Sequence, residues 1–265
     1  MNIAARIPDA APAVVRPAGF GHRPVFTANG RDMLILAAGT AIGSIEFASA
    51  VDIALPELAP GTDYAIVLRD GSPVAVAAED GVPAGAVGGF HFAPGGNADA
   101  RAGGGDAPAI NPASIWDAGF RPACPDPRGM AFVERDGLRF WADIYLLGTD
   151  HLAKGTSRHG ETIADGLSLP AIMGGGKAKR LDFATAQAIY AHHGKRLPTY
   201  DEFRALAFGV TEKSAAGRDP ERTRLDAPRT SAAGIMQAAG SMWVWGTDGH
   251  PTDPRPSIFG GSWIG

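Results

Sequence analysis

Apolar residues in this chain come in short runs interrupted by glycine and proline, a pattern that favours short strands over long helices. The sequence has 36 glycines and 21 prolines among 265 residues, above the usual share. Runs of strand length occupy Met33–Ala38, Ile42–Phe47, Val51–Leu55, Tyr64–Leu68 and Val74–Ala77. Asp70-Gly71 separates the last two runs, and because glycine tolerates a positive φ, this pair predicts a hairpin turn. We therefore expect an antiparallel β-sandwich over residues 26–105.

Two segments of low apolar content set the expected domain boundaries. Residues 1–25 are rich in Ala, Pro and Arg and show neither a helical nor a strand period, so we expect a flexible arm or linker there. Residues 97–106 consist mostly of Gly, Ala and Asp, which is typical of a boundary between packed units. A second domain is therefore expected over residues 106–265.

The second domain is expected to combine helices with strands, which gives an α+β fold class. Asp182–His193 predicts a helix with Gly194 as its C-cap. Its apolar face would consist of Phe183, Ala186, Ile189 and Tyr190. Thr199–Glu202 has the spacing of a capping box, which predicts the start of another short helix. Strand-like apolar segments occupy residues 140–147, 240–246 and 258–265.

Charge and cysteine content narrow the functional classes. The chain has 24 basic and 28 acidic residues, a formal net charge of -4, so we expect binding neither to nucleic acid nor to an anionic membrane surface. The single cysteine, Cys124, excludes an internal disulfide and a cysteine-based zinc site. We expect no signal peptide, because the residues after Arg6 do not form the apolar core that such a peptide needs. No apolar run reaches the roughly 18 residues that a membrane span needs. We expect a soluble product made in the cytoplasm.

Several segments, taken in order, resemble the major tropism determinant family, which supplies receptor-binding proteins at the tail-fibre tip of retroelement-diversified phages. They are LPELAPGTDYAI (Leu55–Ile66), VGGFHFAPGGNADARAGG (Val87–Gly104), FRPACPDPRGM (Phe120–Met130), FWADIYLLGTDHLAKGTS (Phe140–Ser157), HHGKRLPTYDEFRALAFGVTE (His192–Glu212) and FGGSWIG (Phe259–Gly265). The resemblance implies a β-sandwich followed by a C-type-lectin-like domain, the fold that formylglycine-generating enzymes share.

The resemblance also implies partners and a location. We expect a homotrimer in the virion that binds other tail-fibre proteins and a protein or glycan receptor on the bacterial surface, without a cofactor and without catalysis. The family has an N-terminal β-prism, for which no counterpart is expected in residues 1–25. Its variable segment begins where this sequence stops, so we expect the lectin-like domain to be incomplete at its C-terminus.

The motif GGSWIG near the end of the sequence supplies the candidate ligand-binding residues. If it forms a strand, Trp263 points into the core, and Ser262 and Ile264 point the other way, towards solvent. These two positions match the first diversified positions of the family motif, which makes them the predicted site. Trp243 and Trp245, which lie beside glycines, are predicted to belong with Trp263 to the structural core of the binding scaffold.

Metal binding is not expected. Asp248, His250 and Asp253 lie in a Gly/Pro-rich loop whose spacing fits no EF-hand and is typical of a solvated turn. His192 and His193 are adjacent and project from different faces of a helix end, which suits interaction with the helix dipole better than shared metal ligation.

Three alternative functions remain open. A formylglycine-generating enzyme would need a reactive cysteine pair, whereas Cys124 stands alone. A retroelement-diversified bacterial surface or secreted protein would bind ligand in a similar way but would need export. A purely structural fibre connector would bind no ligand.

Overall fold

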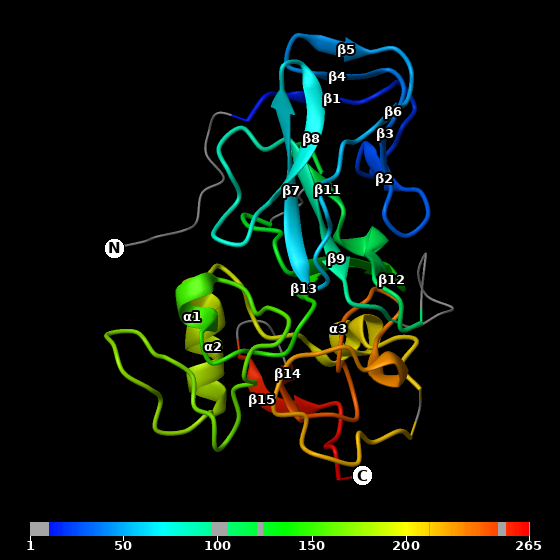
Figure 1. Cartoon of the computed structure of the whole chain (residues 1–265). Coiled ribbons are helices and arrows are strands. Elements are labelled where there is room, and N and C mark those ends of the chain that lie inside the picture. The colour runs from blue at the N-terminus through cyan, green and yellow to red at the C-terminus, as the bar shows by residue number, and fades with distance from the viewer. Residues whose placement is uncertain (1–10, 97–104, 121–123, 212, 249–252, 265) are drawn as a thin grey trace.

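The computed structural model describes residues 11–96, 105–120, 124–211, 213–248 and 253–264. Most strands lie in the upper half of the molecule, and the α-helices lie in the lower half together with the last two strands (Figure 1). The fold is mostly β with few helices.

The upper half is built from short antiparallel strands. In chain order they are β1 (Val14–Val15), β2 (Phe26–Ala28), β3 (Leu34–Leu36), β4 (Thr40–Ile42), β5 (Ile45–Phe47), β6 (Val51–Asp52), β7 (Thr62–Arg69), β8 (Ser72–Ala77), β9 (Gly88–Ala93), β10 (Ala109–Ile110) and β11 (Trp116–Asp117). They form a β1-β4-β5 sheet, a β2-β3-β6 sheet and a larger β10-β9-β7-β8 sheet, in which β11 also pairs with β9. The hairpin prediction is confirmed, because Asp70 and Gly71 connect β7 to β8 with φ values of 49° and 80°.

The strand pattern differs from the sequence expectation at two places. Ile42–Phe47 is not one strand, because the chain turns at Gly43, whose φ is 60°, and β5 pairs back onto β4. The central strand β9 escaped prediction because Gly88 and Gly89 weaken its strand signal. All of its residues are buried, and the two glycines allow Phe26 and Trp116 to approach the backbone closely.

The predicted flexible arm at residues 1–25 is wrong for its described part. Val14 and Val15 pair with β4, and Val25 is fully buried. The Arg16 guanidinium donates to both carboxylate oxygens of Asp117, at 2.6 and 2.8 Å, and the Val25 amide donates to the same carboxylate at 2.8 Å. Because Asp117 is fully buried, these donors compensate a desolvated charge and fix the segment in place. Residues 1–10 lie outside the described residues.

The predicted division at residues 105–106 falls inside the largest sheet. Both β10 and β11 pair with β9, so the sheet continues as far as Asp117. The Gly-rich stretch was interpreted as a boundary because it lacks apolar side chains, yet the chain returns from it to the same sheet. Residues 97–104 of that stretch lie outside the described residues.

The lower half carries the helices and two further hairpins. Its elements are β12 (Met130–Arg135), β13 (Leu138–Asp143), α1 (His151–Lys154), α2 (Phe183–His192), α3 (Tyr200–Leu206), β14 (Val244–Asp248) and β15 (Arg255–Phe259), and short 3-10 turns occupy Pro112–Ser114 and Ala227–Arg229. Both predicted helices are present, and Thr199 and Glu202 form the predicted capping box at α3. In α2, Asp182 is the N-cap and not a helical residue, and the C-cap is His193 and not Gly194. The strand predicted at 140–147 ends at Asp143, and Ile144 continues, buried, without strand pairing.

A buried hydrogen-bond relay joins the two halves. His91 on β9 contacts Asp63 on β7 through Nδ1 at 2.9 Å and the Tyr145 hydroxyl through Nε2 at 2.9 Å. Because a carboxylate only accepts, Nδ1 donates to Asp63. The same Asp63 oxygen accepts from the Gly129 amide at 3.0 Å. Two contacts from the lower half therefore converge on the largest sheet of the upper half.

Another buried histidine fixes α1 against α2. The His151 ring packs edge-on against Tyr190 with centroids 5.0 Å apart, and its Nδ1 lies 2.9 Å from the Ser157 hydroxyl. His151 is fully buried, and its Nε2 has no hydrogen-bond partner among the described residues. Burial lowers the pKa of His151 to about 3. The ring is therefore neutral in the folded protein near neutral pH.

Replacing Tyr145 with Phe removes one hydroxyl from the relay, and the buried Nε2 of His91 loses this hydrogen-bond partner. We expect Tyr145→Phe to lower the free energy of unfolding by about 1–3 kcal/mol. Urea denaturation measures this, with Tyr200→Phe as the control, because Tyr200 is 55% exposed. Equal losses in the two variants would contradict the role of the relay.

The pKa of His151 predicts how stability depends on pH. A histidine whose folded pKa lies near 3 and whose ordinary pKa is 6.5 takes up a proton on unfolding between those values. Its contribution is fully present above pH 6.5 and declines as the pH falls towards 3, at up to about 1.4 kcal/mol per pH unit. We expect His151→Phe to make the stability profile shallower between pH 6 and 4 in urea titrations. The exposed His22→Phe variant should retain the wild-type slope, and an unchanged slope in His151→Phe would refute the assignment.

Candidate functional site

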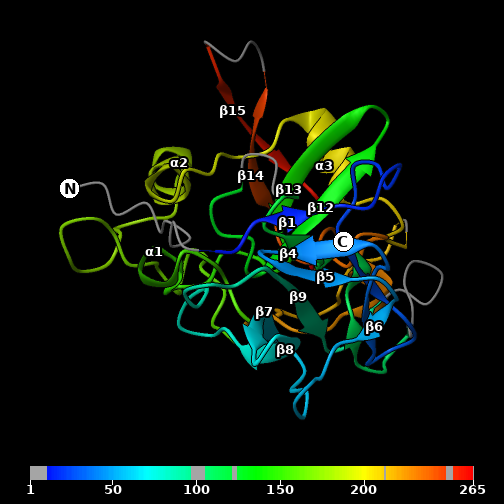
Figure 2. The same ribbon diagram turned by 90° about the horizontal axis from the view of Figure 1, so that it is seen from above.

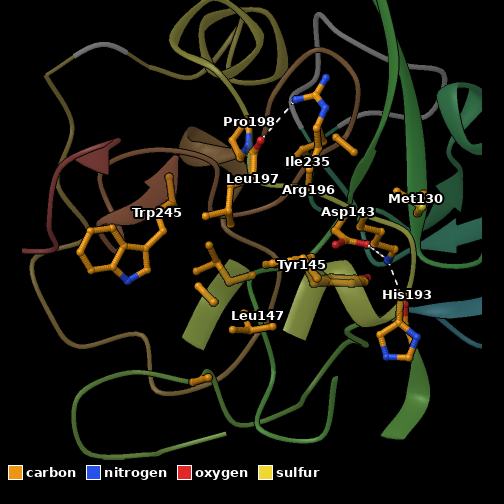
Figure 3. A pocket seen from close by; sticks show the side chains of 18 of the residues that line it. Met130, Asp143, Tyr145, Leu147, His193, Arg196, Leu197, Pro198, Ile235 and Trp245 are labelled. Atoms are coloured by element: carbon orange, nitrogen blue, oxygen red, sulfur yellow. Dashed lines mark hydrogen bonds and ion pairs between the residues drawn. The ribbon is translucent and has the colours of Figure 1, made fainter. Parts of the chain in front are cut away.

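A large cavity lies in the lower half, between β13, α2, α3 and the β14–β15 hairpin. Its volume is about 1570 Å³. Figure 3 shows that Leu147, Leu197, Ile235 and Trp245 form part of an apolar wall. A pocket of this kind, mostly apolar with a few polar groups, is the usual form of a binding site.

The β14–β15 hairpin is positioned by packing on α3. The Phe259 ring lies against Gly246, where a side chain would collide with it, and stacks on Phe203 of α3 with centroids 5.2 Å apart. In the antiparallel register Trp245 pairs with Ile258. Because neighbouring positions of a strand point to opposite faces, packing Phe259 on α3 turns Trp245 and Ile258 towards the cavity, and both line it.

Residues at and before the start of α3 also hold the β14–β15 hairpin in place. Pro198 accepts a hydrogen bond from the Thr247 amide at 2.8 Å. Next to it, the Arg196 guanidinium donates to both carboxylate oxygens of Glu202, at 2.6 and 2.5 Å. The hydrogen bond from Arg196 lowers the pKa of Glu202, and the Thr199 amide contributes in the same direction. The polar groups here serve the capping box and the orientation of the hairpin.

The predicted core residue Trp243 requires a correction. Its side chain is 56% exposed, at the mouth of the cavity, so it does not belong to the core. The aromatic pattern was interpreted as buried because it lies beside glycines. Ile258, which was not singled out, is 51% exposed and also lines the cavity. The alternation of a strand was the signal that could have placed it on the face opposite Phe259.

Trp245 and Trp263, which were also predicted to belong to the scaffold core, are half-buried in the cavity wall. Trp245 donates from Nε1 to the Leu181 carbonyl at 3.1 Å, and its ring packs edge-on against Phe183 with centroids 6.1 Å apart. Trp263 accepts a hydrogen bond from the Gly217 amide through its carbonyl at 2.9 Å. Both residues line the cavity.

The predicted ligand-binding residues do not lie on a strand. β15 ends at Phe259, and Gly260 and Gly261 follow with φ values of 92° and 75°, which break the alternation on which the prediction depended. Ser262 is half-buried, lines the cavity and accepts from the Ile264 amide at 3.2 Å. Ile264 is 75% exposed and does not line the cavity. The structure therefore places Ser262 at the cavity with the three tryptophans, and Ile264 on the adjoining surface.

Two charged groups of the cavity form an ion pair. The Lys195 ammonium lies 2.6 Å from the Asp143 carboxylate and donates to the Gly155 carbonyl at 2.9 Å. His193 contacts the Leu152 carbonyl through Nε2 at 2.9 Å, and burial lowers its pKa. Figure 3 shows His193 and Asp143 on the same side of the cavity. Sequence spacing gave no signal for the ion pair, because its partners lie 52 residues apart.

No metal-binding cluster of three or more His, Cys, Asp or Glu side chains is found within the described residues. Asp248 and Asp253 are exposed, and His250 lies outside the described part of the chain. Cys124 is buried, with its Sγ 3.7 Å from the Met130 sulfur. No helix in the described ranges is long and apolar enough to cross a bilayer.

Comparisons with known proteins give a consistent result. A family model described as the Mtd second domain matches residues 24–117, and this match ends at the last residue of β11. The chain is 39% identical over 284 residues to the tail fiber receptor-binding protein of Bordetella phage BPP-1, a match that covers 91% of this chain and 74% of the relative. Solved structures of the I1 and P3c variants of the major tropism determinant superpose with TM-scores of 0.83 and 0.82 at 36% identity, covering 96% of this chain and 78% of each of theirs. The chain therefore belongs to the major tropism determinant family.

Proposed function

We propose that this protein is a phage receptor-binding protein that recognises a protein or glycan on the bacterial surface. The observation that carries the proposal is the 39% identity, over 91% of the chain, to a tail fiber receptor-binding protein. The same relationship supports a location in the virion, in contact with other tail-fibre proteins.

The proposed binding surface is the mouth of the cavity together with the turn that follows β15. Trp243, Ile258 and Ile264 present exposed apolar side chains there, and Ser262 lies beside them. Exposed aromatic residues on a rigid frame are common anchors of protein interfaces. The hairpin is held on α3 by Phe259, so the exposed groups are carried by a fixed support.

The proposed role is binding without catalysis. Two cavity groups capable of acid–base chemistry are engaged in structural contacts: Lys195 with Asp143, and His193 with the Leu152 carbonyl. The formylglycine-generating reaction would need a cysteine pair, and the sequence contains only Cys124. The relatives named above are receptor-binding proteins.

The arrangement of the two halves supports a finer proposal about the fold. We propose that the N-terminal sheets, which share one apolar core cluster, form a β-sandwich, and that the remainder is a C-type-lectin-like domain. Homotrimer formation is proposed with it, and sedimentation equilibrium of the purified chain distinguishes a trimer from a monomer.

Substitutions at the proposed surface should weaken attachment to cells. We expect Trp243→Ala and the double variant Ser262→Arg/Ile264→Asp each to reduce binding of fluorescently labelled protein to a susceptible strain by about 30-fold or more. The measurement is a binding titration by flow cytometry across a panel of bacterial strains, with a strain that binds wild type as the reference.

Met33→Asp is the matched control, because Met33 is 45% exposed and lies in the upper half of the molecule. Its binding should equal that of wild type. If the surface variants fold, by circular dichroism, and still bind like wild type, the proposed surface is wrong. If wild type binds no strain in the panel while the fold is intact, the receptor-binding proposal fails for this chain.

A further inference from the structure

The segment between α1 and α2 exposes apolar and basic side chains together. Leu167 is 90% exposed and Met173 is 58% exposed. Lys177 and Lys179 are exposed in the same segment, and Arg180 is 81% exposed. In Figures 1 and 2 this segment, in yellow-green, forms a loop that extends from the body of the molecule beside the two helices.

The loop is held by defined hydrogen bonds. The Asp165 carboxylate accepts from the amides of Leu167 and Ser168 at 2.7 and 2.5 Å, which closes a tight turn that directs Leu167 outwards. Further along, the amide of the buried Ala178 donates to the Pro170 carbonyl at 2.9 Å. The exposure of the apolar side chains is therefore built into the turns that fix the backbone.

The acidic side chains of this segment are engaged in local hydrogen bonds, whereas two of its lysines have no ion-pair partner among the described residues. Asp165 is used by its turn, and Asp182 caps α2 by accepting from the Thr185 amide at 2.9 Å while it pairs with Arg180 at 2.6 Å. Among the described residues, no ion pair involves Lys177 or Lys179. The acidic groups are engaged by neighbouring donors, whereas two ammonium groups are left to solvent.

Exposed glycines complete the tip of the loop. Gly174, Gly175 and Gly176 have φ values of 87°, 97° and 80°, which few other residues would adopt without strain. A side-chain-free tip between Met173 and Lys177 lets a flat surface approach the backbone closely, because no side chain projects from it.

We propose that this loop makes a peripheral contact with a phosphate-bearing lipid surface. Leu167 and Met173 would enter the boundary between headgroups and acyl chains, and Lys177 and Lys179 would contact lipid phosphates. A purely polysaccharide partner would leave the apolar side chains without a role. The net charge of -4 disfavours a general attraction to anionic surfaces, so the contact is confined to this loop.

The test is co-sedimentation of the full chain with vesicles of phosphatidylcholine alone and with 30% phosphatidylglycerol, a composition chosen as roughly that of an anionic membrane. We expect binding only to the anionic vesicles, weakened by salt. Lys177→Gln/Lys179→Gln should lower the partition coefficient about 20-fold, and Leu167→Ser/Met173→Ser about 10-fold or more.

Lys213→Gln and Met33→Ser are the matched controls, because both residues are exposed and lie outside the loop. They should bind vesicles like wild type. Any of three results would overturn the proposal: wild type does not sediment with anionic vesicles, wild type binds neutral vesicles equally well, or the loop variants bind as well as wild type. The vesicles contain no receptor, so this result is independent of the receptor-binding experiment.

Discussion

The position of the proposed binding surface depends on one buried hydrogen-bond relay. His91, at the centre of the largest sheet, is held by Asp63 on one side and by the Tyr145 hydroxyl on the other. Tyr145 lies two residues after the end of β13 and lines the cavity, and Gly129, just before β12, donates to the same Asp63. The His91 imidazole thus connects the sheet core to the residues that flank the β12–β13 hairpin.

A second constraint positions the β14–β15 hairpin at the mouth of the cavity. The Phe259 ring needs Gly246 beneath it and Phe203 beside it, which sets the face that the β14–β15 hairpin turns towards the cavity. Lys195 is paired with Asp143 and Arg196 with Glu202, so these supporting groups stay fixed while exposed side chains at the mouth can vary. A binding surface of this kind needs no chemistry from the scaffold, which agrees with the family to which the chain belongs.

Local signals in the sequence predicted local structure well. The Asp70-Gly71 hairpin and the Thr199–Glu202 capping box depend on residues close in sequence, and both are found. Features set by distant residues were missed. β9 is a strand because its neighbours pair with it and pack on its glycines, and the segment 11–25 is ordered because Asp117, about 100 residues away, binds Arg16.

The sequence also predicted the geometry of the candidate site only in part. Of the residues predicted for the site and its scaffold, Ser262, Trp243, Trp245 and Trp263 line one cavity. The prediction assigned the wrong geometry, because it treated the segment after Phe259 as a continuing strand, whereas two glycines at positive φ turn the chain. The exposure of Trp243 depends on how the hairpin sits on α3, and composition alone carries no information about that.

Hydrogen–deuterium exchange is the most direct test of the central claim that the cavity mouth binds the receptor. The purified chain would be compared alone and with membrane vesicles from a strain that it binds. The account predicts slower exchange in residues 240–248 and 255–264 and unchanged exchange in β7, β8 and β9. Protection confined to the upper sheets, with none at the cavity mouth, would contradict it.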